Sequence, residues 1–181
     1  CYFCPRDQTP HQGLMTQEAF DQSLARVVEL RDALDTAVHV SLCGLGEPLL
    51  NPRTSGFVRQ VREAGFPCVL SSNGSILDQR RGDALLDAGL EQININVGEI
   101  DEQYEDIYKL PWDKTRDNIL RFHRDAGDSC EVRIVLVDHQ ANPEHLERMK
   151  SYWRGHGIDS FLEFEIMNRG GSLFVDHLQF G

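Results

Sequence analysis

The sequence predicts an α/β fold in which parallel strands alternate with helices. Three observations favour this class: apolar runs of strand length, amphipathic segments of helix length, and the regular alternation of the two along 181 residues. Such alternation is typical of right-handed βαβ crossovers, which build a parallel sheet. The length and a hydrophobic content of 40% suit one domain with a sizeable core. We expect five strands and about five helices, without a linker or a low-complexity tract.

Each expected helix has an apolar stripe and begins or ends at a residue that suits the position. Thr16 and Asp78 can serve as N-caps, and Pro143 fits a first helical turn. Gly65 and Gly89 fit the ends of the helices that precede them. In chain order, the expected helices span residues 16–34, 51–64, 78–89, 112–126 and 143–153.

Each expected strand is a short, mainly apolar run that lies between two of these helices or after the last. In chain order, the expected strands span residues 38–43, 68–71, 92–97, 131–137 and 161–167. Residues 98–111 are the least regular stretch, because they are acidic and also carry Tyr104 and Tyr108. We expect them to form a loop with one helical turn near a ligand site.

Polar and glycine-rich segments lie at the carboxyl ends of four of the expected strands. They span residues 44–48, 72–74, 94–98 and 168–171. Chance would distribute such segments over both ends of a sheet. In open or closed parallel sheets, ligands bind at the carboxyl ends of the strands. The sequence therefore predicts a ligand site at that edge.

The composition argues against several classes of function. The net charge is −11 and the acidic residues are dispersed, so we expect no nucleic-acid partner and no anionic membrane partner. No apolar stretch is long enough to span a bilayer, and no signal peptide is visible. Five cysteines form a poor disulfide framework, which suits a cytoplasmic location. The sequence also contains no GxxxxGK[ST] phosphate loop and no pattern typical of a hydrolytic triad.

Cys1 and Cys4 form a CxxC pair. Such a pair can bind zinc, act as a redox dithiol or ligate iron. Zinc would need two more ligands, and the sequence has no second CxxC or CxxH pair. A thioredoxin-like motif would open a helix directly, whereas Pro5 and a polar loop follow here. The pair alone leaves all three roles open.

A glycine-lined turn followed by a carboxylate occupies residues 44–48, Gly-Leu-Gly-Glu-Pro. Glycine allows another group to approach the backbone closely. A primary ammonium group prefers carbonyl oxygens and a carboxylate as partners. The turn therefore fits the binding of a charged small molecule. The alternative is an ordinary β-turn before a helix, with Pro48 marking the boundary.

Together, in this order and spacing, the CxxC pair and the turn resemble the radical S-adenosylmethionine (radical SAM) superfamily. The signature of that family is CxxxCxxC, followed one βα unit later by a GGEP-like turn, in which Leu45 here replaces a glycine. The resemblance covers nearly the whole chain. It implies a partial (β/α)6 TIM-like barrel with parallel strands, of which this chain lacks the first strand and one cluster cysteine.

The resemblance also implies the extent of the domain. Residues 1–181 would be a radical SAM core domain that is incomplete at its N-terminus. Residues 168–171, Asn-Arg-Gly-Gly, are similar to the NxGG segment that precedes SPASM or twitch extensions. We therefore expect a SPASM/twitch-type member that is truncated at both ends, with any C-terminal auxiliary-cluster domain absent.

The cofactors that the resemblance implies are a 4Fe–4S cluster and S-adenosylmethionine (AdoMet), with an electron donor such as flavodoxin or ferredoxin. Reductive cleavage of AdoMet would give a 5′-deoxyadenosyl radical that abstracts a hydrogen atom from a peptide or a small sugar- or aminocyclitol-like substrate. The acidic residues within 98–106 favour a cationic substrate. This chain alone is expected to hold a cluster poorly and to be inactive. The alternative is a non-catalytic metal-binding or scaffold domain derived from the same barrel.

By resemblance, the metal ligands would be Cys1 and Cys4. The cofactor-binding residues would be Tyr2, Phe3, Gly44, Gly46, Glu47, Pro48, Ser72, Asn73, Asn94, Asn96, Arg133 and Asn168. The alternative for the strand asparagines is bonding to local backbone, and for Arg133 it is a surface ion pair. No catalytic residue is identifiable. Cys43, Cys68 and Cys130 are expected to be structural, with Cys43 buried.

Overall fold

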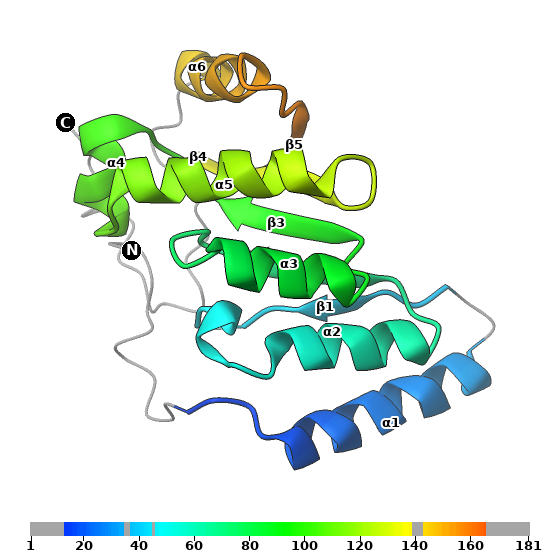
Figure 1. Cartoon of the computed structure of the whole chain (residues 1–181). Coiled ribbons are helices and arrows are strands. Elements are labelled where there is room, and N and C mark those ends of the chain that lie inside the picture. The colour runs from blue at the N-terminus through cyan, green and yellow to red at the C-terminus, as the bar shows by residue number, and fades with distance from the viewer. Residues whose placement is uncertain (1–12, 35–36, 45, 139–142, 166–181) are drawn as a thin grey trace.

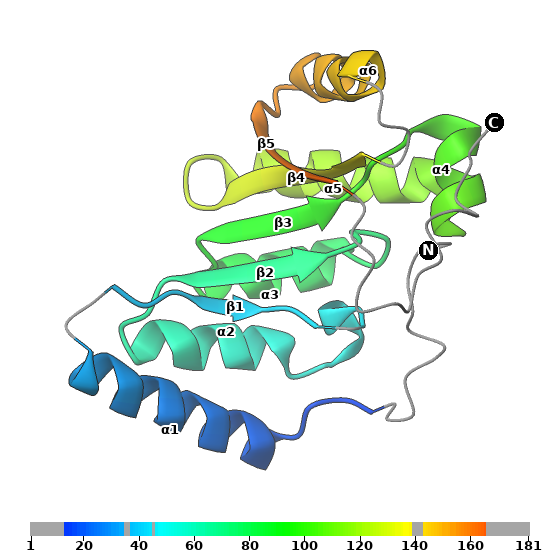
Figure 2. The ribbon, with the colours of Figure 1, turned by 180° about the vertical axis from the view of Figure 1, so that it is seen from behind.

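The strands form one parallel sheet. The computed structural model describes residues 13–34, 37–44, 46–138 and 143–165, and in them the strand order is β1-β2-β3-β4-β5. The strands are β1 (Val40–Leu42), β2 (Cys68–Ser72), β3 (Gln92–Asn96), β4 (Glu131–Asp138) and β5 (Ser160–Glu165). Every neighbouring pair is parallel, so the carboxyl ends share one edge, as the arrowheads of β1, β2 and β3 show in Figure 2. The predicted α/β class with parallel strands is confirmed.

The helices cover one face of this sheet. α2 (Thr54–Glu63), α3 (Gln79–Asp87) and α5 (Trp112–Ala126) lie in front of the strands in Figure 1. α1 (Gln17–Ala33) lies beside α2, and α6 (Pro143–Arg154) packs on β4. In the part of the chain that the structure describes, no helix covers the opposite face, which Figure 2 turns toward the viewer. β1 and β5 are the two edges, so the described sheet is open.

The predicted capping residues begin and end their helices. Thr16 Oγ1 accepts a hydrogen bond from Ala19 N at 3.2 Å, and Asp78 Oδ1 accepts one from Arg81 N at 2.9 Å. Gly89 follows α3 with a φ of 81°, which residues with a Cβ rarely adopt. Local sequence therefore determines these boundaries well.

The second expected helix begins later than predicted. Residues Pro48–Leu50 form a short 3-10 helix, η2, and α2 starts at Thr54 rather than at residue 51. Between them, the buried Asn51 donates from Nδ2 to Met15 O at 2.9 Å. That bond joins segments far apart in the sequence, so no local pattern predicts it.

The segment expected to be a loop contains a helix, α4 (Asp101–Tyr108). Tyr104 and Tyr108 stack with their ring centroids 4.8 Å apart, and Tyr104 lies 5.1 Å from the ring of Trp112. All three aromatic side chains are buried, which stabilises the helix through apolar contact. The prediction of a loop with one helical turn is therefore wrong. It gave weight to the acidic residues of this segment and not to Tyr104 and Tyr108, which form the buried face of the helix.

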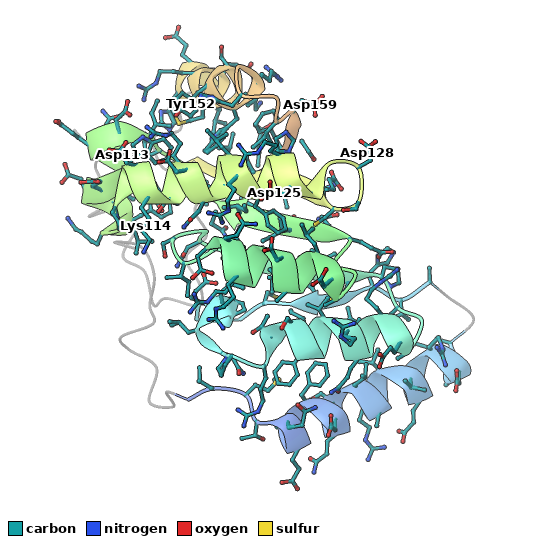
Figure 3. All side chains as sticks on the ribbon, viewed as in Figure 1. Asp113, Lys114, Asp125, Asp128, Tyr152 and Asp159 are labelled. Carbon is teal, nitrogen blue, oxygen red and sulfur yellow. The ribbon has the colours of Figure 1, made fainter. Side chains whose placement is uncertain are left out.

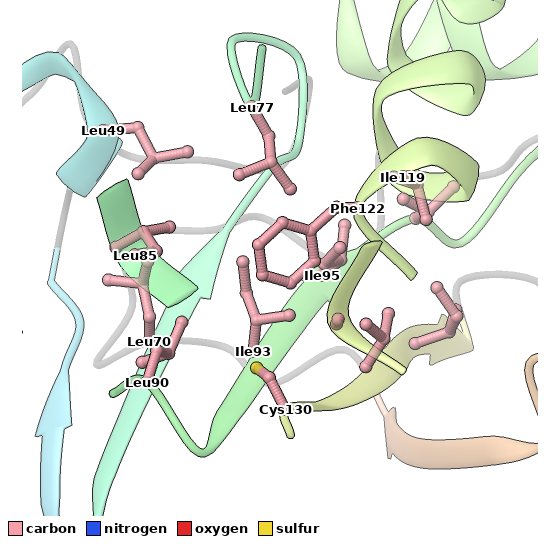
Figure 4. Close-up of a cluster of buried hydrophobic side chains, with 14 of the residues drawn as sticks. Leu49, Leu70, Leu77, Leu85, Leu90, Ile93, Ile95, Ile119, Phe122 and Cys130 are labelled. Atoms are coloured by element: carbon pink, nitrogen blue, oxygen red, sulfur yellow. The ribbon is translucent and has the colours of Figure 1, made fainter. Parts of the chain in front are cut away.

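The main core lies between the sheet and the helices. In Figure 4, Ile93 and Ile95 of β3 and Leu70 of β2 face Ile119 and Phe122 of α5, and all five are at most 1% exposed. Alternate strand residues face this core, and the residues between them are only half-buried. This alternation determines which polar side chains of a strand face the open side of the sheet.

The three described cysteines are free thiols. Cys68 and Cys130 are buried, as expected for structural residues, and burial raises the pKa of each thiol to about 12. Cys43 is exposed, so the expectation that it is buried is wrong. β1 is an edge strand with no fully buried residue, and Cys43 follows the alternation that leaves Ser41 exposed.

Acidic side chains extend from the outer surface, as Figure 3 shows for Asp113 and Asp125 of α5 and for Asp128 after it. The Asp113 side chain is 82% exposed. The excess of acidic residues is therefore at least partly a feature of the helical surface. Among the described residues, no helix combines the length and apolar character that crossing a membrane requires.

Candidate functional site

Glu47 connects the carboxyl ends of β1 and β2. Its Oε2 accepts a hydrogen bond from Asn73 N at 2.8 Å, and its Oε1 accepts one from the Ser72 hydroxyl at 2.9 Å. Oε1 also accepts a bond from Leu49 N at 3.0 Å, through which Glu47 caps η2. The parallel pairing of β1 with β2 places the two turns side by side. The structure thus brings together three predicted residues, Glu47, Ser72 and Asn73.

The Glu47 carboxylate is held in a partly desolvated place. Burial raises the pKa of Glu47 above its ordinary value, and the hydrogen bonds from Asn73, Leu49 and Ser72 oppose that rise. The three bonds leave acceptor capacity on the carboxylate, which offers about four lone-pair positions. A carboxylate that has lost hydration gains more from a nearby cation than a fully solvated one does. The site therefore suits an ammonium group.

A cavity of about 350 Å³ lies beside the turn after β1. Gly44, Gly46, Glu47 and Pro48 line it, together with residues of β1, α1 and α2. A Cβ added at Gly44 would meet no atom within 4 Å in the described structure, and the φ of Gly44 lies outside the left-handed region. No feature of the described chain therefore requires glycine there. Open space along a glycine backbone fits close approach by a ligand.

Asn94 and Asn96 lie on the open face of β3, because residues two apart in a strand share a face. The side-chain amide of Asn94 lies 2.7 Å from that of Gln92, at the start of the strand. Asn96 ends β3 and donates from Nδ2 to Ser72 O at 3.4 Å. Asn96 thus lies beside Ser72, which binds Glu47. Asn94 instead contacts Gln92, toward the amino end of the strand.

Arg133 belongs to a different network, near the start of β4. Its Nη2 donates to the two carboxylate oxygens of Glu131 at 2.9 and 3.1 Å, and its Nε donates to Ser160 Oγ at 3.2 Å. The hydrogen bond from Ser160 and the Arg133 guanidinium hold the pKa of Glu131 below its ordinary value. These contacts favour the ion-pair alternative for Arg133. We therefore leave Arg133 out of the cofactor site.

Five predicted site residues lie outside the described part of the chain. They are Cys1, Tyr2, Phe3, Cys4 and Asn168. Within the described residues, no group of three or more His, Cys, Asp or Glu side chains is arranged to hold a metal ion. Ligation of a cluster by Cys1 and Cys4 therefore stays a prediction.

The structure also shows a buried pair that the sequence analysis missed. His145 Nε2 lies 3.2 Å from Glu99 Oε1, and the two side chains are 3% and 0% exposed. Glu99 follows β3 and His145 is in the first turn of α6, so the pair joins two elements at the carboxyl edge of the sheet. The sequence indicated only that residues 98–106 are acidic. The fold was needed to show that His145 contacts Glu99.

The comparison with protein families identifies the family of this chain. The model of the Radical SAM superfamily matches residues 1–152. The chain belongs to the radical SAM superfamily. Enzymes of this superfamily use AdoMet and an iron–sulfur cluster for radical chemistry. The exposed glycine backbone and the desolvated carboxylate of Glu47 fit the first of these cofactors.

Solved radical SAM structures share this fold at low sequence identity. SuiB from Streptococcus suis, bound to the precursor peptide SuiA, aligns with a TM-score of 0.72 and 13% identity over 93% of this chain and 37% of that chain. SuiB bound to S-adenosylmethionine aligns with a TM-score of 0.65 and 14% identity, over 81% of this chain and 33% of that chain. TYW1 with a lysine–pyruvate adduct aligns with a TM-score of 0.67 and 17% identity, over 97% of this chain and 62% of that chain.

These similarities confirm the partial-barrel fold class and, at such identities, concern the fold alone. The chain spans from about a third to under two thirds of the length of these proteins. No curated protein sequence matches the chain.

Proposed function

We propose that this chain is the core of an enzyme that cleaves AdoMet reductively and then abstracts a hydrogen atom from a peptide or small-molecule substrate. The observation that supports this best is the Glu47 carboxylate, held by Ser72 and Asn73 at the strand edge of a radical SAM chain. An ammonium-binding carboxylate at this place is what the amino group of AdoMet requires.

The residues of this chain would share the work as follows. Glu47 and the backbone carbonyls near Gly44 would accept hydrogen bonds from the AdoMet ammonium group. Asn96, whose Nδ2 already bonds to the backbone of β2, would present its amide oxygen to a ligand hydroxyl. Cys1 and Cys4 would be thiolate ligands of a 4Fe–4S cluster. When bound, the cluster and AdoMet would supply the electron and the 5′-deoxyadenosyl radical.

The substrate class follows from weaker observations. SuiB, which shares the fold, has been solved with a precursor peptide, which supports a peptide substrate for this protein too. Asp101 and Glu102 lie in the first turn of α4, a helix that follows β3 at the carboxyl edge. Their carboxylates would favour a substrate that carries positive charge. An electron donor such as flavodoxin or ferredoxin would complete the system.

The test is the formation of 5′-deoxyadenosine by the native protein, reconstituted anaerobically with iron and sulfide and supplied with AdoMet and dithionite. We expect a product that depends on all four components and is lost in the double variant Cys1→Ser, Cys4→Ser. The control is the same reaction without dithionite. A reconstituted protein that contains a cluster, binds AdoMet and yet forms no 5′-deoxyadenosine would contradict the proposal and favour a scaffold role.

A further inference from the structure

The hydroxyl group of Ser72 makes two hydrogen bonds within the protein and is buried. It donates its only hydrogen to Glu47 Oε1 at 2.9 Å and accepts a hydrogen bond from Gly74 N at 3.0 Å. Ser72 is 2% exposed, and it faces the helices rather than the open side of the sheet. The hydroxyl hydrogen is therefore not available to a ligand on the open side of the sheet.

The backbone around Ser72 is fixed as well. Gly74 has a φ of 74°, and a Cβ there would come within 3.2 Å of both Ile95 and Ile119. The next side chain, Asn73, accepts hydrogen bonds from Ser75 N at 2.9 Å and from Ser75 Oγ at 2.7 Å. The turn after β2 is therefore a rigid support from which Ser72 reaches across to Glu47.

We propose that Ser72 is a positioning residue, which fixes the Glu47 carboxylate for the ammonium group of AdoMet and does not itself contact the cofactor. This inference rests on the proposed function, and it changes the role that sequence resemblance assigned to Ser72. The bond orients one carboxylate oxygen and leaves acceptor capacity on the other, which takes only the bond from Asn73 N among the described contacts.

The electrostatics of Glu47 agree with this geometry. Burial raises the pKa of the carboxyl, and the Ser72 hydroxyl is one of three donors that lower it. Glu47 interacts electrostatically with Tyr104, and burial raises the pKa of the Tyr104 phenol to about 12. Tyr104 is therefore neutral over the range in which Glu47 ionises. Loss of the Ser72 hydroxyl should raise the pKa of Glu47 further.

The experiment measures AdoMet affinity of the native reconstituted protein as a function of pH, by anaerobic calorimetry. Binding should weaken as the pH falls through the pKa of Glu47. This loss of affinity at low pH is the acid limb of the binding profile. In Ser72→Ala the acid limb should move to higher pH, because a hydrogen bond to the charged carboxylate is lost. Binding at mildly acidic pH should then be weakened by about tenfold. Ser72→Thr keeps the hydroxyl and should restore the wild-type profile.

Two further variants identify the cause of any change. Glu47→Gln should remove the acid limb and leave weak, pH-independent binding. Ser129→Ala removes a hydroxyl that donates to Ala126 O at the far end of the sheet, and it should leave the profile unchanged.

The inference is overturned if folded Ser72→Ala has the wild-type profile, or if the acid limb persists in Glu47→Gln. If Ser72→Ala does not fold, Ser72→Thr tests the inference instead. Ser72→Thr keeps the hydroxyl, so an acid limb shifted from that of the wild type would contradict the role of the hydroxyl. A wild-type protein that binds no AdoMet at any pH would instead contradict the proposed function.

Discussion

At the scale of single residues, Glu47 combines burial with three hydrogen-bond donors. Burial outweighs these donors and raises the pKa of Glu47, so its negative charge destabilises the folded protein, and a bound cation would offset that cost. This conflict between stability and function is expected at a binding site.

The pH dependence of stability tests the burial of Glu47. Its folded-state pKa is raised above the ordinary value, so its contribution to stability is complete at acid pH and is lost as the pH rises through the folded pKa. Glu47→Gln does not titrate and should lose less stability between about pH 4 and pH 8. Urea denaturation at both pH values measures the difference. The exposed Glu29→Gln is the control, and a wild-type change no larger than that of Glu47→Gln would contradict the account.

Gly44 provides the complementary test. A methyl group there enters open space, so Gly44→Ala should leave the free energy of unfolding of the ligand-free protein unchanged or raise it by about 0.4–1 kcal/mol. The same methyl group should weaken AdoMet binding by obstructing the approach to the backbone. Thermal unfolding with and without AdoMet measures both effects. Equal stabilisation of wild type and variant by AdoMet would exclude close contact at Gly44.

Single residues also show where sequence reasoning stops. The turn that contains Glu47 was predictable because its glycines and its carboxylate are contiguous in the sequence. For Arg133 the sequence left a cofactor contact and a surface ion pair open, and the structure adds a bond from Arg133 to Ser160 of the neighbouring strand to the pair with Glu131. Strand pairing brings Arg133 and Ser160 together, and a pattern in one segment does not contain that information.

At the scale of elements, α4 illustrates how tertiary contact overrides local appearance. Its acidic side chains suggested a loop, but Tyr104 and Tyr108 form a buried stack that makes the helix part of the core. The predicted caps at Thr16 and Asp78 were correct because capping depends on a few neighbouring residues. Burial of an aromatic face depends on the rest of the fold.

The hydroxyl of Tyr108 connects α4 to the end of β3. Gly98 N donates to Tyr108 Oη at 2.8 Å in a buried setting. Tyr108→Phe should therefore lower the free energy of unfolding by about 1–3 kcal/mol, because a buried donor loses its partner. Tyr104→Phe is the matched control, since its ring is also buried while its hydroxyl lies 3.5 Å from Thr115 Oγ1. Chemical denaturation of both variants gives the comparison, and equal losses would contradict this role for Tyr108.

At the scale of the whole molecule, the order of elements was predictable and the position of the site followed from it. Regular alternation predicts a parallel sheet, and a parallel sheet places its strand ends together. The turns after β1 and β2 therefore meet, although they are far apart in the sequence. The Ser72–Glu47 bond and the Glu99–His145 pair required the three-dimensional arrangement.

AdoMet binding by the native reconstituted protein tests the central claim most directly. The claim is that the carboxylate at the edge of β1 and β2 holds the cofactor. Anaerobic calorimetry at neutral pH should show binding that weakens by at least about tenfold in Glu47→Gln, since a charge-assisted hydrogen bond is lost. Glu29→Gln, a surface change on α1, should bind as the wild type does. Equal affinity of wild type and Glu47→Gln would contradict the account.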